Sequence, residues 1–278
     1  MLERFSKALL RALAMAFTVI TPALLLPWTD VTTSQFAVFM ALVAGVFTFS
    51  EYHAESPSLI SFRDAAPFNR IRFIALLVMV LGVALILRDD LAPTTLSRVM
   101  TAFGTVAAKL LDFPYSPVRL LSALAPDGEG PRLARAGGLC YLVGIMAILA
   151  LSLVMRLSVW PARRGVFNIW VNLPLFGFAL FDNGRQSDLR LRFLWEARVN
   201  LILGILLPFC LPVAVQWGTA GAGLPAFNVP HMMVWWVALW AFVPAGLVMR
   251  GIALWRLSQM IAEQRKRALA PGGQWRVA

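Results

Sequence analysis

The chain is 278 residues long and carries 25 Lys and Arg against 14 Asp and Glu, a formal net charge of +11. Hydrophobic residues make up 59% of it and the mean hydropathy is +0.73, whereas soluble domains are about 45–50% apolar. This composition excludes an ordinary soluble domain, because the apolar residues form uninterrupted runs and not the periodic pattern of a soluble core.

Six apolar stretches of about 17–20 residues contain no Asp or Glu and almost no Lys or Arg. A helix of about 20 residues crosses a hydrocarbon core about 30 Å thick. We therefore predict an all-α polytopic membrane protein with six transmembrane helices, whose single domain covers residues 1–278. The predicted spans are approximately residues 8–27, 31–50, 71–87, 136–155, 199–217 and 231–249.

Basic residues divide unequally between the two sides of such a protein. With the amino terminus inside, 19 of the 25 Lys and Arg residues fall in cytoplasmic segments and six fall outside, all within 88–135. Because cytoplasmic loops carry the excess of Lys and Arg, we predict that both termini are cytoplasmic. The net charge then faces anionic lipid head groups, a simpler interpretation than nucleic-acid binding. The ratio of Arg to Lys, 22 to 3, is typical of a GC-rich bacterial genome and favours the bacterial inner membrane.

The outer loop, residues 88–135, contains an amphipathic pattern. Pro93, Thr94 and Thr95 are typical of a helix start, and apolar side chains then recur at helical spacing. The apolar positions are Leu96, Met100, Phe103, Ala107 and Leu110, and Ser97, Arg98, Thr101 and Lys109 fall largely away from them. We predict an amphipathic helix over about 95–111 that lies along the outer membrane surface. The alternative is that its apolar side packs on the outer ends of the spans.

Two cytoplasmic segments, 51–70 and 159–198, mix charged residues with aromatic residues and prolines. Within the second, 166–181 is apolar but too short to span, which fits an interfacial or re-entrant segment. Irregular backbone at membrane depth has to be buried in protein or hydrated. The charged residues that follow predict a helix that continues into the fifth span. Residues 256–278 form a basic cytoplasmic tail.

Pro208 and Pro212 lie four residues apart inside the fifth span, and each removes a backbone hydrogen bond, so we expect a helix kink there. A broken helix near mid-membrane is one indication of a transport site. The central parts of the spans, however, contain no Asp, Glu, Lys or Arg, which ion coupling and charged substrates normally need. Helix packing is the simpler interpretation, and small residues one turn apart, such as Ala41 and Gly45, favour close contact between spans.

No catalytic motif accompanies this architecture, since the sequence has no HExxH, GxSxG or P-loop pattern. Glu51, His53 and Glu55 are possible metal ligands, but they share a face only in an extended strand, so a solvated polar loop is the simpler interpretation. Cys140 and Cys210 lie inside predicted spans, where packed thiols are more common than a disulfide or a metal pair. We expect no enzyme activity, no cofactor and no metal.

These observations favour a non-catalytic subunit, assembly factor or scaffold of a membrane complex, which contacts lipids and a membrane-protein partner or a second copy of itself. The alternative is a facilitative transporter or channel for a small neutral solute. Topology requires Lys and Arg in the cytoplasmic segments but no acids. We therefore expect the acids there to pair with neighbouring arginines and form an interaction platform under the second, third and fifth spans. The alternative is that these charges are solvated and only anchor the helix ends. The platform residues are Asp64, Arg70, Arg72, Asn183, Asp188, Arg190 and Arg192.

Overall fold

The computed structural model describes residues 2–27, 31–54, 66–125, 128–157, 189–219 and 229–269. Within these ranges all regular secondary structure is helical, and no strand occurs. The helices are α1 (Leu2–Leu25), α2 (Val31–His53), α3 (Ala66–Leu91), α4 (Thr95–Leu110), α5 (Pro117–Ser122), α6 (Gly130–Leu157), α8 (Leu189–Gly218) and α9 (Pro230–Leu269). The predicted interfacial or re-entrant segment, 166–181, lies outside the described residues.

Among the described residues, six helices are long and apolar enough to cross a membrane, namely α1, α2, α3, α6, α8 and α9. They coincide with the six predicted stretches, which confirms six candidate spans and a helical fold for the part of the chain that the structure describes. Two of them are longer than a membrane requires, because α8 has 30 residues and α9 has 40. At about 1.5 Å per residue these helices are about 45 and 60 Å long. Helix α9 thus continues from the sixth stretch into the segment predicted as a basic tail.

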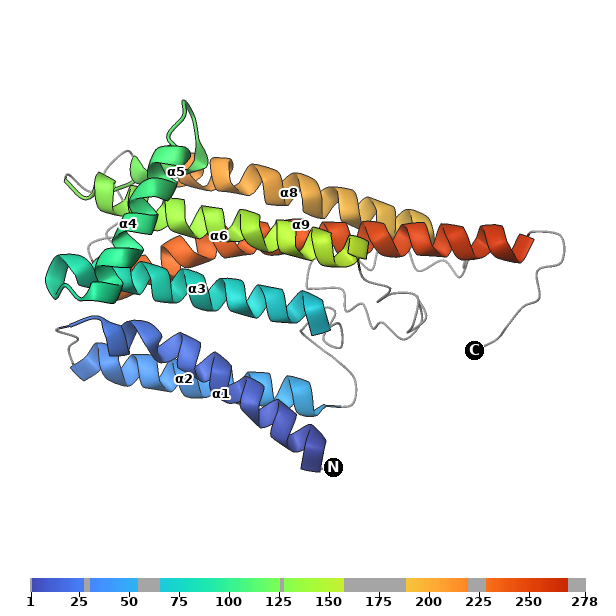
Figure 1. The fold of residues 1–278 in the computed structure, drawn as a ribbon, viewed down its shortest axis with the longest axis horizontal. Coiled ribbons are helices and arrows are strands. Elements are labelled where there is room, and N and C mark those ends of the chain that lie inside the picture. Colours follow the sequence, from blue (N-terminus) through green and yellow to red (C-terminus); the bar gives the residue numbers. More distant parts are fainter. Residues whose placement is uncertain are drawn as a thin grey trace.

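Successive long helices run in opposite directions along the same axis, so their ends gather at the two ends of the bundle (Figure 1). Helices α1 and α2 form a hairpin beside α3, and α6, α8 and α9 lie on the other side of α3. Helices α4 and α5 cross one end, which we call the α4 end. The opposite end, which we call the Arg72 end, holds the start of α3 and the end of α9, and there α8 and α9 continue past α3 and α6.

The interior consists of two apolar clusters between α3, α6 and α9. The cluster nearer the α4 end includes Met79, Val83, Cys140 and Val237, and the cluster nearer the Arg72 end includes Phe68, Leu151, Met249 and Leu254. Both cysteines are free thiols. Cys140 is fully buried, as expected of a packed residue, whereas Cys210 is exposed on α8.

Small residues bring α8 and α9 into backbone contact. A Cβ atom on Gly204 would lie 2.8 Å from the carbonyl oxygen of Pro244, and one on Gly251 would lie 3.0 Å from the carbonyl oxygen of Ala197. These distances are too short for a side chain to be added without a shift of the backbone. The two helices therefore pack as closely as small residues allow.

The α1–α2 hairpin is joined by small residues in its middle and by aromatic side chains at the Arg72 end. A Cβ atom on Gly45 would lie 3.5 Å from the Cβ of Ala16, so this part of the predicted small-residue pattern does form a helix contact. The guanidinium of Arg11 on α1 lies 4.1 Å from the ring centre of Tyr52 on α2, and the ring centres of Phe5 on α1 and Phe49 on α2 are 5.3 Å apart. Much of the outer side of α2 is apolar and exposed.

Ion pairs tie the helices together at the α4 end. Asp90, at the end of α3, lies 2.7 Å from Arg132 and 3.6 Å from Arg135 of α6. Arg88 donates a hydrogen bond of 2.7 Å to the carbonyl oxygen of Leu25, the last residue of α1. A cation at this position stabilises a helix carboxyl terminus, where carbonyl groups lack helical partners.

Helix α4 begins at the predicted position, where Thr94 is its N-cap residue. Thr94 and Ser97 bond each other's backbone N–H groups through their hydroxyls, a capping box in which Ser takes the usual place of Glu. The Ser97 hydroxyl also donates to a carboxylate oxygen of Asp89 at 2.8 Å, which ties the start of α4 to the end of α3.

The side of α4 that packs on the protein is formed by small residues, with Ser97, Gly104 and Ala107 buried. A Cβ atom on Gly104 would lie 3.0 Å from the carbonyl oxygen of Arg135 in α6. Of the five predicted apolar positions, Ala107 is buried and Met100 is partly buried. The other three, Leu96, Phe103 and Leu110, are exposed, so the described helices do not cover the largest apolar side chains of α4.

Candidate functional site at the ends of α3, α8 and α9

The structure describes four of the seven predicted platform residues, which are Arg70, Arg72, Arg190 and Arg192. Arg70 is exposed in the first turns of α3, and Arg190 is exposed at the start of α8. Arg72 and Arg192 are partly buried. The other three residues, Asp64, Asn183 and Asp188, lie outside the described residues, so their pairing with arginines stays a prediction.

Arg72 of α3 turns toward α9 and lies among aromatic rings. Its guanidinium carbon is 5.6 Å from the ring centre of Phe68, one turn earlier on α3, and 5.6 Å from that of Phe242 on α9. Gly246 lies beside this guanidinium, since a Cβ atom there would be 3.5 Å from an Nη atom of Arg72, an ordinary van der Waals distance. The Nε atom of Arg72 is covered and has no hydrogen-bond partner among the described residues.

A second group of charges joins α8 to α9. Arg192 donates a hydrogen bond of 3.2 Å to one carboxylate oxygen of Glu196, and an Nη atom of Arg250 lies 3.9 Å from the other. The carbonyl oxygen of Glu196 accepts a hydrogen bond of 2.7 Å from the amide of Asn200. Arg250 is 6% exposed, so this carboxylate balances a buried cation in a region of low dielectric.

The two groups lie within electrostatic range of each other, since the charges of Arg72 and Arg250 interact. Tyr52, at the end of α2, is also within electrostatic range of Arg72. We call Arg72, Arg192, Glu196 and Arg250 the arginine cluster. It holds three guanidinium groups and one carboxylate, and it joins the third and fifth spans to the sixth span.

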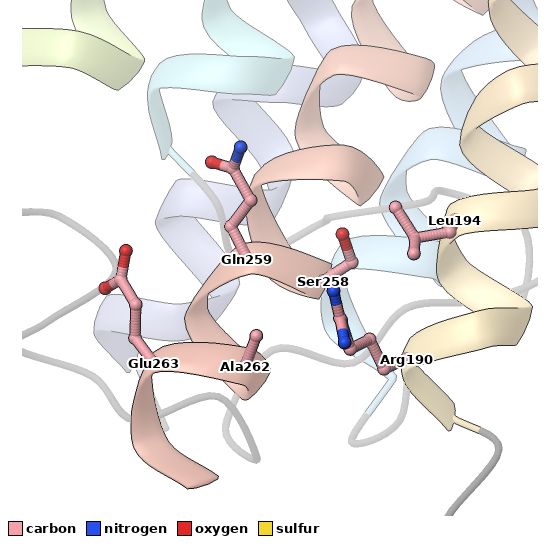
Figure 2. Close-up of a pocket in the computed structure, with 6 residues that line it drawn as sticks. All are labelled: Arg190, Leu194, Ser258, Gln259, Ala262 and Glu263. Atoms are coloured by element: carbon pink, nitrogen blue, oxygen red, sulfur yellow. The ribbon is translucent and has the colours of Figure 1, made fainter. Parts of the chain in front are cut away.

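An open pocket of about 290 Å³ lies between α8 and α9 farther along the Arg72 end. Figure 2 shows Arg190 and Leu194 on α8 facing the turns of α9 that carry Ser258, Gln259, Ala262 and Glu263. Arg190 extends across from α8 toward Ser258 (Figure 2). Polar groups of both signs therefore line a recess on the part of the α8–α9 pair that continues beyond the other helices.

The two prolines of α8 contact the sixth span. Pro212 has no N–H group, so the carbonyl oxygen of Pro208 has no helical partner. The indole N–H of Trp240 in α9 donates to this oxygen at 3.2 Å. Pro208 and Pro212 are both buried, and Trp240 packs on Tyr141 of α6 with ring centres 5.8 Å apart. The carbonyl group freed by Pro212 is thus used in helix packing.

The possible metal ligands are not brought together where the structure describes them. Glu51 and His53 lie on α2, where residues two apart do not share a face, and Glu55 lies outside the described residues. Glu51 is buried, whereas His53 is exposed and stacks on Phe49. Among the described residues no group of three or more His, Cys, Asp or Glu side chains has the arrangement of a metal site.

The platform prediction did not include Glu196 and Arg250, two members of the arginine cluster. Glu196 follows Arg192 by four residues, a spacing that pairs side chains on a helix, so the sequence does contain this signal. Arg250 was counted only as a topogenic flanking charge. Comparison of the chain with family models, with curated proteins and with solved structures finds no match.

Proposed function

We propose that this protein is inserted in the bacterial inner membrane with its Arg72 end and both termini in the cytoplasm. The unequal division of Lys and Arg supports this orientation. Two exposed tryptophans on α8 support the proposed depth of the protein in the membrane. Trp195 and Trp217 on α8 are 68% and 82% exposed and lie 22 residues apart, which is about 33 Å along a helix. Tryptophan is enriched at both membrane interfaces, about 30 Å apart.

In this orientation α4 lies on the outer membrane surface. Its small residues pack on α6, and Leu96, Phe103 and Leu110 point away from the described helices. Exposed apolar side chains on a helix that crosses the end of a membrane bundle fit burial at the boundary between lipid head groups and acyl chains (Figure 1).

The biochemical role we propose is that of a non-catalytic subunit, assembly factor or scaffold of a membrane complex. The observation that carries this proposal is the extension of α8 and α9 beyond the other helices at the Arg72 end (Figure 1). About 20 residues of α9 suffice to cross the membrane, so about 19 residues beyond Arg250, roughly 28 Å, remain for the cytoplasm. We call these residues of α9, 251–269, together with the start of α8, the α8–α9 arm. The arm carries the charged recess around Arg190, Gln259 and Glu263, a surface for a membrane-protein partner or a second copy of the chain.

The alternative function, a facilitative transporter or channel for a small neutral solute, relies on Pro208 and Pro212. A substrate site needs the backbone groups that prolines release to be available to a ligand. The Pro208 carbonyl is instead hydrogen-bonded to Trp240. This contact favours helix packing over a transport site at Pro212.

Site-specific photo-crosslinking in cells tests the interaction role. A photoreactive residue at Gln259, in the recess, is expected to give one discrete adduct, and one at the exposed Arg98 of α4 is the control at the other end. Reversing charge with Glu263→Arg is expected to reduce the Gln259 adduct several-fold, because this carboxylate lines the same recess. Equal crosslinking from both positions, or an adduct insensitive to Glu263→Arg, would contradict a partner at the arm.

A further inference from the structure

Arg72 is a partly buried cation with no anion beside it among the described residues. Its covered Nε atom has no hydrogen-bond partner there. The guanidinium lies near the rings of Phe68 and Phe242, and Tyr52 is within electrostatic range. Cation–π contacts contribute about 0.5–2 kcal/mol each, whereas an uncompensated buried charge costs several kcal/mol. Aromatic rings alone therefore leave the guanidinium under-compensated, and an anion is expected beside it.

The nearby carboxylate is already engaged. Glu196 binds Arg192 at 3.2 Å and lies 3.9 Å from Arg250. Glu196 is thus engaged by Arg192 and Arg250, and Arg72 and Arg250 lie within electrostatic range of each other. An additional anion at Arg72 would lower the repulsion between the two guanidinium groups.

The depth of Arg72 matches the head groups of the inner leaflet. On α3 it lies 16 residues, about 24 Å, from Arg88 at the α4 end. A hydrocarbon core about 30 Å thick that begins near Arg88 thus ends slightly beyond Arg72. A long arginine side chain extends toward head groups from such a position. Part of the Arg72 side chain remains accessible, so a head group has a route to it.

We propose that Arg72, with Arg250 behind it, binds the phosphate of an anionic phospholipid of the inner leaflet. A guanidinium donates two parallel hydrogen bonds to a phosphate, and basic recesses between spans on the cytoplasmic side bind anionic lipids. Phe242 and Gly246 form the α9 side of this site, because the ring supports the guanidinium and Gly246 lies beside it. The bound lipid links α3 to α9 at the base of the arm. This inference holds whether or not the arm binds a protein.

The test uses the full chain, purified in mild detergent and transferred to nanodiscs that contain phosphatidylcholine with or without phosphatidylglycerol. Native mass spectrometry counts the lipids retained. We expect the wild-type protein to retain phosphatidylglycerol preferentially, and Arg72→Gln to weaken this retention about tenfold, the value of one charge-assisted pair. The control is Arg156→Gln, which replaces an exposed arginine of α6 at the Arg72 end, and it is expected to change phosphatidylglycerol retention less than twofold.

Four results would overturn the proposal. The first is no preference for phosphatidylglycerol in the wild-type protein. The second and third concern the variants: equal losses of phosphatidylglycerol retention in Arg72→Gln and Arg156→Gln, or no loss in Arg72→Gln. The fourth is displacement of the lipid by millimolar inorganic phosphate, which would indicate a site for a soluble anion. If Arg72→Gln does not fold, wild-type protein is labelled with a photoreactive phosphatidylglycerol. Adducts at residues 68–72 or 242–250 support the site, and adducts confined to other residues refute it.

Discussion

The contact between Pro208 and Trp240 shows how one missing N–H group is compensated by another helix. In a bilayer no water is available to an unpaired carbonyl, so each such group needs a partner in the protein. The Trp240 indole supplies it at 3.2 Å, and Trp240 is 7% exposed. The hydrogen bond also fixes the position of α8 along α9, beside the close backbone approach of Gly204 and Pro244.

We predict that Trp240→Phe lowers the free energy of unfolding by about 1 kcal/mol or more, since it leaves the Pro208 carbonyl unpaired. Trp236→Phe is the matched control, because Trp236 is about half exposed on the same helix. The double variant Trp240→Phe/Pro212→Ala should recover part of the loss, because residue 212 regains the N–H that reaches Pro208. Reversible unfolding in mixed micelles measures all three. Equal effects of Trp240→Phe and Trp236→Phe, with no recovery of the free energy of unfolding in the double variant, would contradict this explanation.

At the scale of the element, α4 shows that periodicity locates a helix more easily than it assigns its faces. The observed helix, Thr95–Leu110, is within one residue of the predicted 95–111. Its protein-packing side is formed by Ser97, Gly104 and Ala107, because only small side chains allow contact with the backbone of α6. The bulky apolar residues of α4 therefore face away from the protein. Hydropathy alone does not distinguish this arrangement from one in which they pack on the protein.

Spin labels on α4 test its placement at the membrane. A label at position 103 is expected to be accessible to oxygen dissolved in lipid, because Phe103 is apolar and 60% exposed on the surface of the protein. A label at position 98 is expected to be accessible to a water-soluble relaxation agent, because Arg98 is exposed and charged. Electron paramagnetic resonance in liposomes measures both. If the two labels were equally accessible to the aqueous agent, α4 would not lie on the membrane with the proposed side down.

At the scale of the molecule, the bundle has two chemically different ends. The α4 end is closed by α4, α5 and ion pairs such as Asp90–Arg132. The Arg72 end carries the arginine cluster and the α8–α9 arm. Under the proposed orientation, the outer end is closed by local contacts and the cytoplasmic end is the one that other molecules reach.

The proposed topology predicts that reporter fusions at Gly128 and Gly184 are found on opposite sides of the membrane. Gly128 belongs to the outer loop and Gly184 to the second cytoplasmic segment. Alkaline phosphatase should be active at Gly128 and inactive at Gly184, and a cytoplasmic fluorescent reporter should show the reverse. The same result at both positions would refute the six-span arrangement.

The sequence by itself determined the number, approximate position and apolar character of the six candidate spans. The physical reason is local, because a segment in lipid satisfies its backbone within its own helix, so about 20 apolar residues are sufficient to identify it. It also located the start of α4, since a capping box needs only residues three apart.

Tertiary structure decided which side chains meet. Arg72 and Arg70 are the same residue type two positions apart, yet one turns toward Phe242 and the other is exposed. Arg250 pairs with Glu196, more than 50 residues away, and Trp240 bonds Pro208 from 32 residues away. Such contacts depend on how helices rotate and slide against one another, which small residues like Gly204 and Gly251 determine through close packing. That information lies in pairs of distant positions and not in any one segment.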